Sequence, residues 1–383
     1  KSMRVLALGG SGGMGRFSSF AISDFPNISK VTIADLNEAN AIEFANNFDE
    51  RFVGIGLDVA DLINLEKIMN DHDVVLNTTG PFFKFGEPIL KTAIKCKCHY
   101  LDICDDWEPT IDMLKLNDEA KKNDVSAIIG LGASPGISNL LGLKAINELD
   151  SVDSIITGWD VSSAKPEDES SQSGTNAAME HALQQISGEI KVFIDDDYKM
   201  IKPLEKFDIN YPGRGKYNGY IFGHPEAISF PHHFNGLKES LNVCHGSSES
   251  DIYVIKVLRW LVDNKIISFK RGASLLEWFE RKIGAPDLEK QIKGLPAIYG
   301  LASGMKDHKK ASVAVTLSED ELTNSWGMGA ITGFPLAFGL KLLLEKKIDK
   351  KGVFAPEGGA IDPDDFFPLL TDYPLIVSRS WEN

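Results

Sequence analysis

The feature that most constrains the fold is the glycine-rich turn "ALGGSGGMGRF", residues 7–17, which follows the apolar run "RVLAL" and precedes a helix-like segment. It contains the pattern G-x-G-x-x-G, built from Gly10, Ser11, Gly12, Gly13, Met14 and Gly15. In such a turn the first motif glycine permits the bend, the second admits a pyrophosphate to the backbone, and the third lets helix pack on strand. The N–H groups at the helix start would then hold the diphosphate. We therefore predict a dinucleotide-binding turn.

Asp35 strengthens this interpretation, because it ends the next strand-like run and lies 20 residues past Gly15. Its carboxylate would accept hydrogen bonds from the adenosine ribose, and it would repel a 2′-phosphate. Leu36 and Asn37 follow it, so no arginine stands ready for that phosphate. We expect NAD as cofactor, with NADP as the alternative. A plain helix-capping role for Asp35 is the other interpretation.

Strand-like and helix-like segments alternate through the first third of the chain. Strands are expected at residues 4–8, 30–35, 51–58, 73–78, 98–103 and 126–131, and helices at 14–25, 38–48, 62–70, 87–95 and 107–122. Repeated β-α units with nearly continuous apolar strands predict a parallel sheet covered on both faces. The expected fold class is α/β, with a Rossmann-type doubly wound sheet.

Ligands of such sheets bind outside the carboxyl ends of the strands. The third strand ends near Asp58, which we expect at the adenine edge. The fourth ends at Thr78, Thr79 and Gly80, which we expect beside the ribose and nicotinamide. A turn or capping role is the alternative for each of these side chains.

After residue 139 the pattern changes to strands at 154–161, 191–194 and 311–317 and helices at 250–264 and 275–283. The stretch "YPGRGKYNGY" is turn-rich, and residues 162–175 are expected to form a polar surface loop or lid. We predict a dinucleotide-binding domain at 1–135 and an α+β substrate-binding and dimerisation domain at 136–324.

Composition narrows the classes of function. The formal net charge is −15, and Lys and Arg form no run that could follow a nucleic-acid backbone, so no nucleic-acid partner is expected. The most apolar window, residues 327–344, falls short of the ~20 residues that span a bilayer, and it predicts a buried helix and no membrane partner. Four cysteines form neither a disulfide framework nor a paired metal motif, which favours reduced thiols in the cytoplasm and no metal site.

A reaction at nitrogen needs a group that moves protons near neutral pH, and histidine is the natural choice. His224 stands before Pro225 and Glu226, and that carboxylate could orient or charge the ring. His181 lies one helical turn before Gln185. These two histidines are the catalytic candidates, with ordinary structural roles as the alternative.

Three segments make the resemblance to a family specific: "VVLNTTGPFFKFGEPILKTAIKCKCHYLDI" from residue 74, "GASPGISNLL" from residue 132 and "TGFPLAFGLKLLLEKKIDKKGVFAPE" from residue 332. The chain resembles the saccharopine dehydrogenase (saccharopine reductase) family, whose relatives include lysine 6-dehydrogenases and carboxynorspermidine dehydrogenases. The resemblance implies hydride transfer between a nicotinamide cofactor and a carbon bearing nitrogen. It also implies that residues 325–383 return to the first domain, that Asp102 faces the cleft, and that the chain forms a homodimer.

The same resemblance makes "GASPG" a substrate-side hinge that faces the nicotinamide, which adds Ser134 to the candidate catalytic residues. From the residues alone, Ser134 is also a good helix N-cap, with Pro135 at the first helical position. The family has an aspartate where this chain has Ser134, and its cysteine after the next strand has no counterpart here. The leading hypothesis is therefore an NAD(P)-dependent oxidoreductase acting on a C–N bond of an amino acid or polyamine-like substrate. The alternatives are an NAD(P)-binding sensor without turnover and an oxidoreductase of C=C or C–OH bonds.

Overall fold

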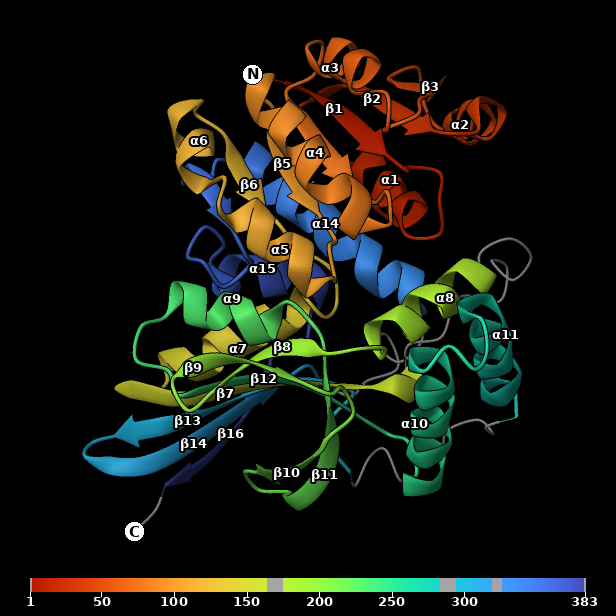
Figure 1. The fold of residues 1–383 in the computed structure, drawn as a ribbon. Helices are drawn as coiled ribbons and strands as arrows, with labels where there is room; N and C mark the ends of the chain where they lie inside the picture. Colours follow the sequence, from red (N-terminus) through yellow and green to blue (C-terminus); the bar gives the residue numbers. More distant parts are fainter. Residues whose placement is uncertain (1, 164–174, 283–293, 319–325, 382–383) are drawn as a thin grey trace. The chain divides into compact units, whose positions relative to one another are not determined.

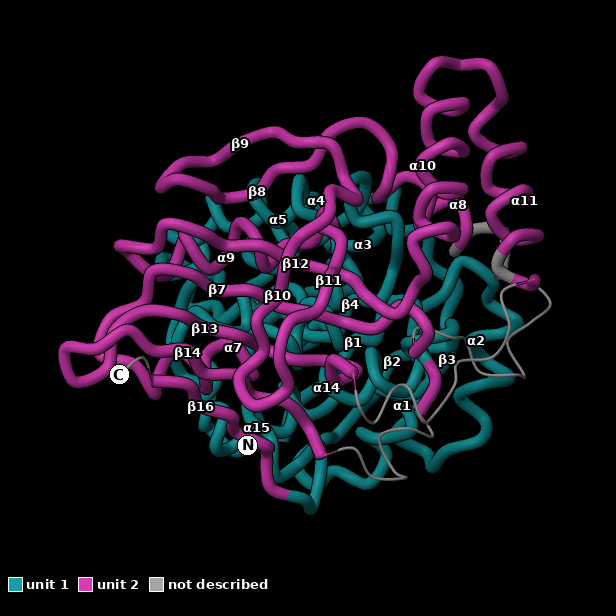
Figure 2. Tube along the Cα trace, turned by 90° about the horizontal axis from the view of Figure 1, so that it is seen from below, with its two compact units in different colours: residues 1–140, 328–373 teal, residues 141–327, 374–383 magenta. Residues whose placement is uncertain are grey.

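The computed structural model describes residues 2–163, 175–282, 294–318 and 326–381. The chain forms two compact units, shown in Figure 2: unit 1 contains residues 1–140 and 328–373, and unit 2 contains residues 141–327 and 374–383. The expected lid at 162–175 and the expected boundary at 324 lie almost entirely outside the described residues.

Unit 1 is built on a seven-stranded sheet, counted in the described residues, with the order β15-β6-β5-β4-β1-β2-β3 (Figure 1). Its strands are β1 (Met3–Leu8), β2 (Ile28–Asp35), β3 (Phe52–Gly56), β4 (Val74–Asn77), β5 (His99–Asp102), β6 (Ser126–Ile128) and β15 (Gly352–Phe354). All neighbouring strands pair in parallel. Val5, Leu6 and Val75 are fully buried, as a sheet covered on both faces requires. The predicted doubly wound parallel sheet is confirmed.

Helices connect these strands in the predicted alternation. They are α1 (Gly15–Ser23), α2 (Glu38–Ala45), α3 (Leu62–Met69), α4 (Phe82–Lys95), α5 (Trp107–Leu114) and α6 (Asn117–Lys122). Helix α4 begins at Phe82, earlier than predicted, with Pro81 at its N-cap, and it continues through Pro88 in its second turn. The segment predicted as one helix at 107–122 is two helices, since α5 ends before Lys115.

The C-terminal part of the chain returns to unit 1 as α14 (Met328–Leu344), β15 and α15 (Pro363–Leu370). Helix α14 packs against α1, and the contact depends on Gly333, where a Cβ would lie 2.4 Å from the Met14 carbonyl oxygen. Strand β15 extends the sheet beside β6, with Val353 opposite Ala127. The buried helix predicted from the apolar window is α14. None of the helices in the described ranges combines the length and apolarity that a membrane crossing needs.

Unit 2 has a nine-stranded mixed sheet in the described residues, with the main order β10-β11-β12-β7-β13-β14-β16, and with β8 pairing with β12 and β9 pairing with β8. The strands are β7 (Ser151–Asp160), β8 (Ile190–Ile194), β9 (Asp197–Ile201), β10 (Lys206–Tyr211), β11 (Gly215–Phe222), β12 (Glu239–His245), β13 (Ile298–Lys306), β14 (Lys309–Thr316) and β16 (Ile376–Trp381). The helices are α7 (Ile137–Asn147), which begins in unit 1, α8 (Thr175–Gln185), α9 (Glu226–His233), α10 (Glu249–Asp263) and α11 (Phe269–Glu280). The central β7 pairs in parallel with β12 and antiparallel with β13.

Two expectations for this unit are wrong. Most of the turn-rich stretch "YPGRGKYNGY" is strand, because only residues 212–214 form the turn and Gly215 already begins β11. Residues 374–383 do not return to the first domain with the rest of the C-terminal segment. They belong to unit 2, since β16 pairs antiparallel with β14.

Candidate cofactor and substrate sites

The glycine-rich turn has the tight geometry that its sequence predicts. A Cβ on Gly15 would lie 2.1 Å from the Gly9 carbonyl oxygen, so the start of α1 can approach β1 only because Gly15 has no side chain. Gly13, in contrast, faces open space, and a Cβ placed on it would have no heavy atom within 4 Å. The first turn of a helix also presents N–H groups that lack intrahelical partners. The turn therefore offers the small residues, space and N–H donors that a dinucleotide diphosphate needs.

Asp35 ends β2 beside this turn, where its Oδ2 accepts a 2.7 Å hydrogen bond from Ser11 Oγ. The helix after it is capped by Asn37, whose side chain accepts from the Asn40 N–H, so the alternative capping role belongs to Asn37 and not to Asp35. Asp58 is exposed after β3 and accepts from the Ala60 N–H, which closes a short turn. Asp58 thus has the turn role that was its alternative.

The end of β4 lies next to the glycine-rich turn through Thr78. Its hydroxyl donates to the carbonyl oxygens of Leu8 and Gly9, both at 3.0 Å, and so fixes the turn to β4. Thr79 donates its backbone N–H to Asn77 Oδ1, and Gly80 is exposed, with nothing within 4 Å of the place that a Cβ would occupy. Thr79 and Gly80 are thus the residues of this segment that remain accessible to a ligand.

Asp102 is fully buried, and the expectation that it faces a cleft is wrong. Its Oδ1 accepts from the backbone N–H groups of Cys104 and Gly130, and its Oδ2 accepts from the Tyr100 hydroxyl. Burial raises the pKa of this carboxyl group to about 6, against the opposing effect of these hydrogen bonds. Asp102 therefore joins the ends of β5 and β6 instead of contacting a ligand.

The later turn "GASPG" is closed by its own backbone. Gly132 donates to the Pro135 carbonyl, and Ile137 donates back to the Gly132 carbonyl, each at 2.9 Å. Gly136 adopts φ +125°, and a Cβ there would lie 1.9 Å from the Gly132 carbonyl oxygen. Because these N–H groups are used inside the turn, they do not form a second phosphate seat.

Ser134 is not the N-cap of the following helix, as the sequence suggested, because α7 begins only at Ile137. Asn139 holds the start of this helix instead, since its Oδ1 accepts from the Gly136 N–H at 2.8 Å while its Nδ2 donates to Glu357 Oε2 at 2.7 Å. Asn139 and Glu357 are both buried. The turn is therefore held by the returning C-terminal segment of unit 1.

His224 lies in unit 2, where it is buried between aromatic side chains. Its ring stacks on Trp159 of β7 with centroids 5.5 Å apart and an angle of 8° between the planes. Phe222 meets the same ring edge-on at 4.9 Å. Glu226 Oε2 lies 3.9 Å from His224 Nδ1.

A hydrogen-bond network connects the partners of His224. Asn242 donates to Glu226 Oε1 at 3.2 Å and to the Thr157 hydroxyl at 2.9 Å, and its Oδ1 accepts from the Trp159 indole N–H. The strands β7 and β12 thus orient the carboxylate and the aromatic face that contact His224. Sequence reasoning found the His224–Glu226 pair, but it missed Trp159 and Asn242, which come from other strands.

Three other histidines, His181, His72 and His99, have surroundings that suit proton transfer less well. His181 is half-buried on α8, with Gln185 one turn further on. His72 contacts Thr32 Oγ1 and the Ile68 carbonyl oxygen, and His99 Nδ1 accepts from the Ser126 N–H. Burial lowers the pKa of His99 to about 4, so its ring is neutral near pH 7.

Arg16 is a residue that the sequence reasoning overlooked. It directly follows Gly15 on α1, and its guanidinium lies 4.8 Å from the centroid of the Phe17 ring. Its Nε is buried and has no hydrogen-bond partner among the described residues. The sequence could have identified Arg16 as a candidate, because it is the single basic residue in "GGSGGMGRF".

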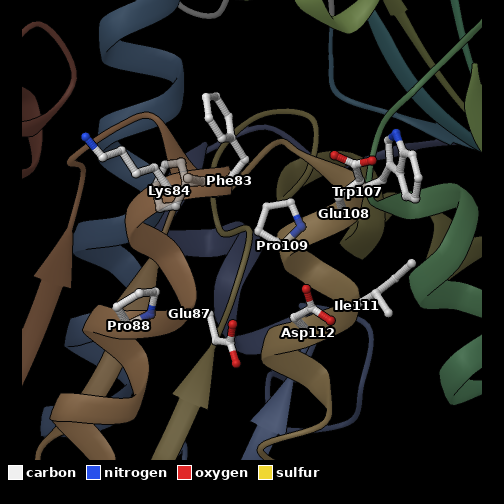
Figure 3. Close-up of a pocket in the computed structure, with 10 residues that line it drawn as sticks. Phe83, Lys84, Glu87, Pro88, Trp107, Glu108, Pro109, Ile111 and Asp112 are labelled. Atoms are coloured by element: carbon white, nitrogen blue, oxygen red, sulfur yellow. The ribbon is translucent and has the colours of Figure 1, made fainter. Parts of the chain in front are cut away.

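A groove of about 460 Å³ lies in unit 1 between the first turns of α4 and α5 (Figure 3). Phe83 and Trp107 stand at its upper end in the view of Figure 3, with Glu108 beside Trp107. Glu87 and Asp112 lie lower down, and Lys84 is the one basic residue that lines it. Three carboxylates and two large aromatic rings favour a cationic ligand over an anionic one.

These features define a class. A parallel sheet with a glycine-rich turn after β1, an acidic residue at the end of β2 and accessible positions after β4 is a nicotinamide dinucleotide-binding domain of the Rossmann type. Residues 5–128 match the family described as the saccharopine dehydrogenase NADP binding domain. This part of the chain is therefore similar to the NADP binding domain of saccharopine dehydrogenases, and the resemblance drawn from the sequence is confirmed.

Two proteins from Saccharomyces cerevisiae are similar to this chain. The NADP⁺-dependent, L-glutamate-forming saccharopine dehydrogenase is 29% identical over 119 residues, which are 31% of this chain and 25% of the relative. The match thus spans about a quarter of that protein's length. The solved structure of apo saccharopine dehydrogenase (L-Glu forming) covers 100% of both chains with a TM-score of 0.63 and 17% identity. At this identity the structural match establishes the fold alone.

The comparisons also bear on the cofactor. They support a nicotinamide cofactor, and the description of the matching domain favours NADP over NAD. The preference for NAD, which rested on Asp35, is not supported by them.

Proposed function

We propose that the protein is an NAD(P)-dependent oxidoreductase that acts on a C–N bond of an amino acid or polyamine-like substrate. The observation that carries the proposal is the cofactor turn of unit 1, whose packing requires Gly15 and whose sequence lies inside the matched family domain. The bound dinucleotide would supply or accept the hydride. The residues of this chain would bind it, orient the substrate and move the proton at nitrogen.

The cofactor seat consists of the backbone around Gly12, Gly13 and Met14, with Asp35 at the adenosine ribose and Thr79 and Gly80 toward the nicotinamide. The family description makes NADP(H) the first cofactor to test. Arg16 adds a positive charge at the start of α1, where it would favour the phosphate groups. Asp35 opposes a 2′-phosphate, so we expect it to limit the affinity for NADP(H).

The proton-transfer group in this proposal is His224, with His181 as the second candidate and Ser134 as a hydrogen-bonding group of the substrate side. The support for His224 is its contact with a carboxylate and an aromatic face. The carboxylate of Glu226 lies 3.9 Å from the ring, the indole of Trp159 stacks on it, and Asn242 holds the carboxylate in place. A ring that can carry a proton in this position can deliver it to an imine nitrogen or remove it from an amine.

The groove between α4 and α5 supports an amine-bearing substrate. Its carboxylates Glu87, Glu108 and Asp112 outnumber its single basic residue, and Phe83 and Trp107 add aromatic faces. Glu87 forms an ion pair with Lys91, and Asp112 forms one with Lys115. Glu108, which lies beside the Trp107 ring, is therefore the carboxylate of the groove that we expect to bind a cation. A second ammonium group of a diamine or basic amino acid fits this chemistry.

Two measurements test the proposal. NADPH and NADH fluorescence titrations establish dinucleotide binding, and absorbance of the reduced cofactor follows turnover with lysine, saccharopine, agmatine-like amines and keto acids in both directions. Turnover of an amine supports the proposal. A Glu108→Gln variant should then raise KM for a diamine while leaving cofactor affinity unchanged, and a Glu119→Gln variant on α6, outside the groove, serves as the matched control.

The rival function is a dinucleotide sensor. It is favoured by Ser134, which stands where the family has an aspartate and cannot hold a negative charge against a substrate amine. Tight NADPH binding with no consumption across the amine panel would support the sensor and reject the enzyme. Absence of binding to either dinucleotide would reject both. The four free thiols agree with a cytoplasmic site of action under either function.

A further inference from the structure

The turn that joins α10 to α11 is held firmly in unit 2. Figure 2 shows the two helices side by side, with this turn at one end of the pair. The Ile266 N–H donates to the Leu261 carbonyl oxygen at 2.9 Å. Gly272 lets α11 approach α10, since a Cβ there would lie 2.6 Å from the Val262 side chain. Ile267 packs against a core cluster of unit 2, whereas its neighbour Ile266 remains outside.

Three large apolar side chains are exposed around this turn. Trp260, in the last turn of α10, is 55% exposed, and Ile266 is 57% exposed. Phe269, the first residue of α11, is 36% exposed. Single apolar residues are normal on a protein surface, but three so close together form a patch of the kind that marks a binding surface.

Basic side chains accompany this patch. Lys265, Lys270 and Arg271 are exposed, and none of them forms an ion pair in the part of the chain that the structure describes. Asp263 is the single acidic residue of the segment 260–271, so three positive charges minus one leave +2 here, in a chain of −15. We call Trp260, Lys265, Ile266, Phe269, Lys270 and Arg271 the basic tip. A positive surface on so acidic a protein favours an anionic partner.

Other acidic residues of the two helices lie away from the basic tip. Glu249 and Asp251 are in the first turn of α10, ~20 Å from its end at a rise of 1.5 Å per residue. Glu277 and Glu280 are in the last turn of α11, at the end of that helix opposite the tip. The end of the helix pair that exposes the apolar side chains is therefore also the end with the positive charge.

The outer side of α11 continues the pattern. Arg271, Leu275 and Trp278 follow one another at i, i+4 and i+7, and Lys282 extends this stripe just past the helix. Leu275 is 42% exposed and Trp278 is 58% exposed. Lys282 Nζ lies 4.6 Å from the Trp278 ring centroid. Tryptophan and leucine between basic side chains are typical of a helix that lies in the interface of a bilayer.

We propose that the basic tip attaches unit 2 to an anionic lipid surface. Its apolar side chains enter the boundary of the acyl chains, and its basic side chains lie at the lipid phosphates. Each basic residue near such a surface strengthens binding about fivefold. Attachment of this kind needs no spanning helix, and the expectation of no membrane partner rested on spanning segments alone.

An acidic protein partner matches the basic tip less well. At the exposures of its three apolar residues, the tip offers on the order of 250 Å² of apolar surface. One side of a standard protein interface takes about 800 Å², of which roughly 60% is apolar. The tip thus supplies about half of the apolar area that a stable protein complex needs, whereas a bilayer can accept a small tip.

Binding of the full chain to lipid vesicles tests this inference. The probes are vesicles of phosphatidylcholine alone and vesicles in which about a third of the lipid is phosphatidylserine. Co-sedimentation with the anionic vesicles should be roughly tenfold stronger than with the neutral ones. Because charges contribute to this binding, it should weaken as the salt concentration rises.

A first pair of variants tests the charge. Lys270→Gln/Arg271→Gln should weaken binding to the anionic vesicles about twentyfold, because two basic residues are lost. Lys121→Gln/Lys122→Gln on α6 is the matched control, since these two lysines are also adjacent and exposed but lie in unit 1. The control should bind the anionic vesicles like the wild type.

A second pair of variants tests the apolar contact. Ile266→Ser keeps the charge of the tip but removes an apolar side chain, so binding should fall about tenfold. Ile63→Ser on α3 is the control, because Ile63 is 86% exposed and lies outside the tip. Lipids with brominated acyl chains should quench tryptophan fluorescence of the wild type, and a Trp260→Phe variant should lose part of this quenching.

Circular dichroism and NADPH titration should be the same for all these proteins, because the tip positions are exposed and the cofactor turn belongs to unit 1. Vesicle binding needs no turnover, so the inference stands or falls independently of the proposed function. A wild type that binds neither kind of vesicle, or a Lys270→Gln/Arg271→Gln variant that binds like the wild type, would overturn the inference. Binding to polyglutamate but not to vesicles would also overturn it, in favour of an acidic protein partner.

Discussion

Asn139 and Glu357, 218 positions apart in the sequence, are joined by a 2.7 Å hydrogen bond in the interior of unit 1. Asn139 simultaneously accepts from the Gly136 N–H, so one amide side chain connects the tight turn before α7 with the returning C-terminal segment. This arrangement uses the donor and the acceptor of a single amide group. Neither an apolar residue nor a carboxylate could replace it.

The first prediction concerns this pair. Asn139→Asp keeps the acceptor for the Gly136 N–H but places a second carboxylate against Glu357, which should cost about 3 kcal/mol of unfolding free energy. Adding Glu357→Gln restores a donor and an acceptor, so the double variant should recover at least half of the loss. Thermal and denaturant unfolding of the two single variants and the double variant forms the cycle. Additive losses would show that the two side chains are not coupled.

The second prediction concerns cofactor choice. Asp35→Ser removes the carboxylate that opposes a 2′-phosphate, so the affinity for NADPH should rise about tenfold, equivalent to ~1.4 kcal/mol, and the affinity for NADH should fall. Asp58→Asn is the control, since Asp58 is also an acidic residue after a strand of unit 1 but has a turn role. Equal changes for the two dinucleotides would remove Asp35 from the ribose site.

The third prediction separates packing from binding at the glycine-rich turn. Gly15→Ala would place a methyl group 2.1 Å from the Gly9 carbonyl oxygen, so unit 1 should lose several kcal/mol of stability or fail to fold. Gly13→Ala points into open space, so its melting temperature should stay close to that of the wild type. Weakened NADPH binding by a stable Gly13→Ala protein would locate the cofactor there, and unchanged binding would exclude that position.

The fourth prediction concerns pH. The pKa of Asp102 is raised from 3.8 to about 6 by burial, so between these values the folded state binds more protons than the unfolded state. Its contribution to stability is therefore present below pH 4 and is lost as the pH rises through 6, by about 3 kcal/mol. The Asp102→Asn variant should lack this loss, so its stability relative to the wild type should improve from pH 4 to pH 7.

His99, on the same strand, should act in the opposite direction. Burial lowers its pKa from 6.5 to about 4, so the unfolded state binds more protons in this range and stability rises with pH. The two contributions oppose each other in the wild type. A His99→Gln variant should reveal the falling slope from Asp102, and a rising slope in that variant would contradict the assignment.

The fifth prediction concerns proton transfer. Replacing His224 by Asn should lower kcat by a factor of about 10² to 10⁴ while the NADPH dissociation constant stays the same, because general acid–base catalysis contributes on this scale. His308→Asn is the matched control: His308 adopts φ +63° in the turn between β13 and β14, a conformation that asparagine accepts well. An unchanged kcat for the His224 variant would exclude His224 as the proton-transfer group and leave His181 as the candidate.

Strands β1 to β6 of unit 1 could be predicted because each is a short apolar run closed by glycine or a polar residue, as "RVLAL" is before the glycines. The β10–β11 hairpin could not be predicted. Turn-forming residues such as Pro212 and Gly213 made the whole stretch look like a loop, because the sequence does not show which strand pairs with which. Strand β15 has three residues, and its pairing with β6 is a long-range contact that local periodicity does not contain.

The parts of the candidate site that could be predicted are those whose residues lie close together in the sequence. The glycine-rich turn and the His224–Glu226 pair are contiguous in sequence, and both were found. Asp102 was misjudged because its place at the cleft was carried over from the family resemblance. Here the Tyr100 hydroxyl and two backbone N–H groups hold it in the interior. Trp159 was missed because its contact with His224 joins segments 65 positions apart.

The pairing of β15 with β6 has a consequence for the synthesis of the protein. A ribosome delivers residues in order, and the sheet begun at Met3 receives its outermost strand only after Phe354 has emerged. Until then the edge of β6 is uncovered, and the Glu357 partner of Asn139 has not been synthesised. Nascent chains should therefore depend on a chaperone through most of translation, and unit 1 should reach its finished state late although it is encoded first.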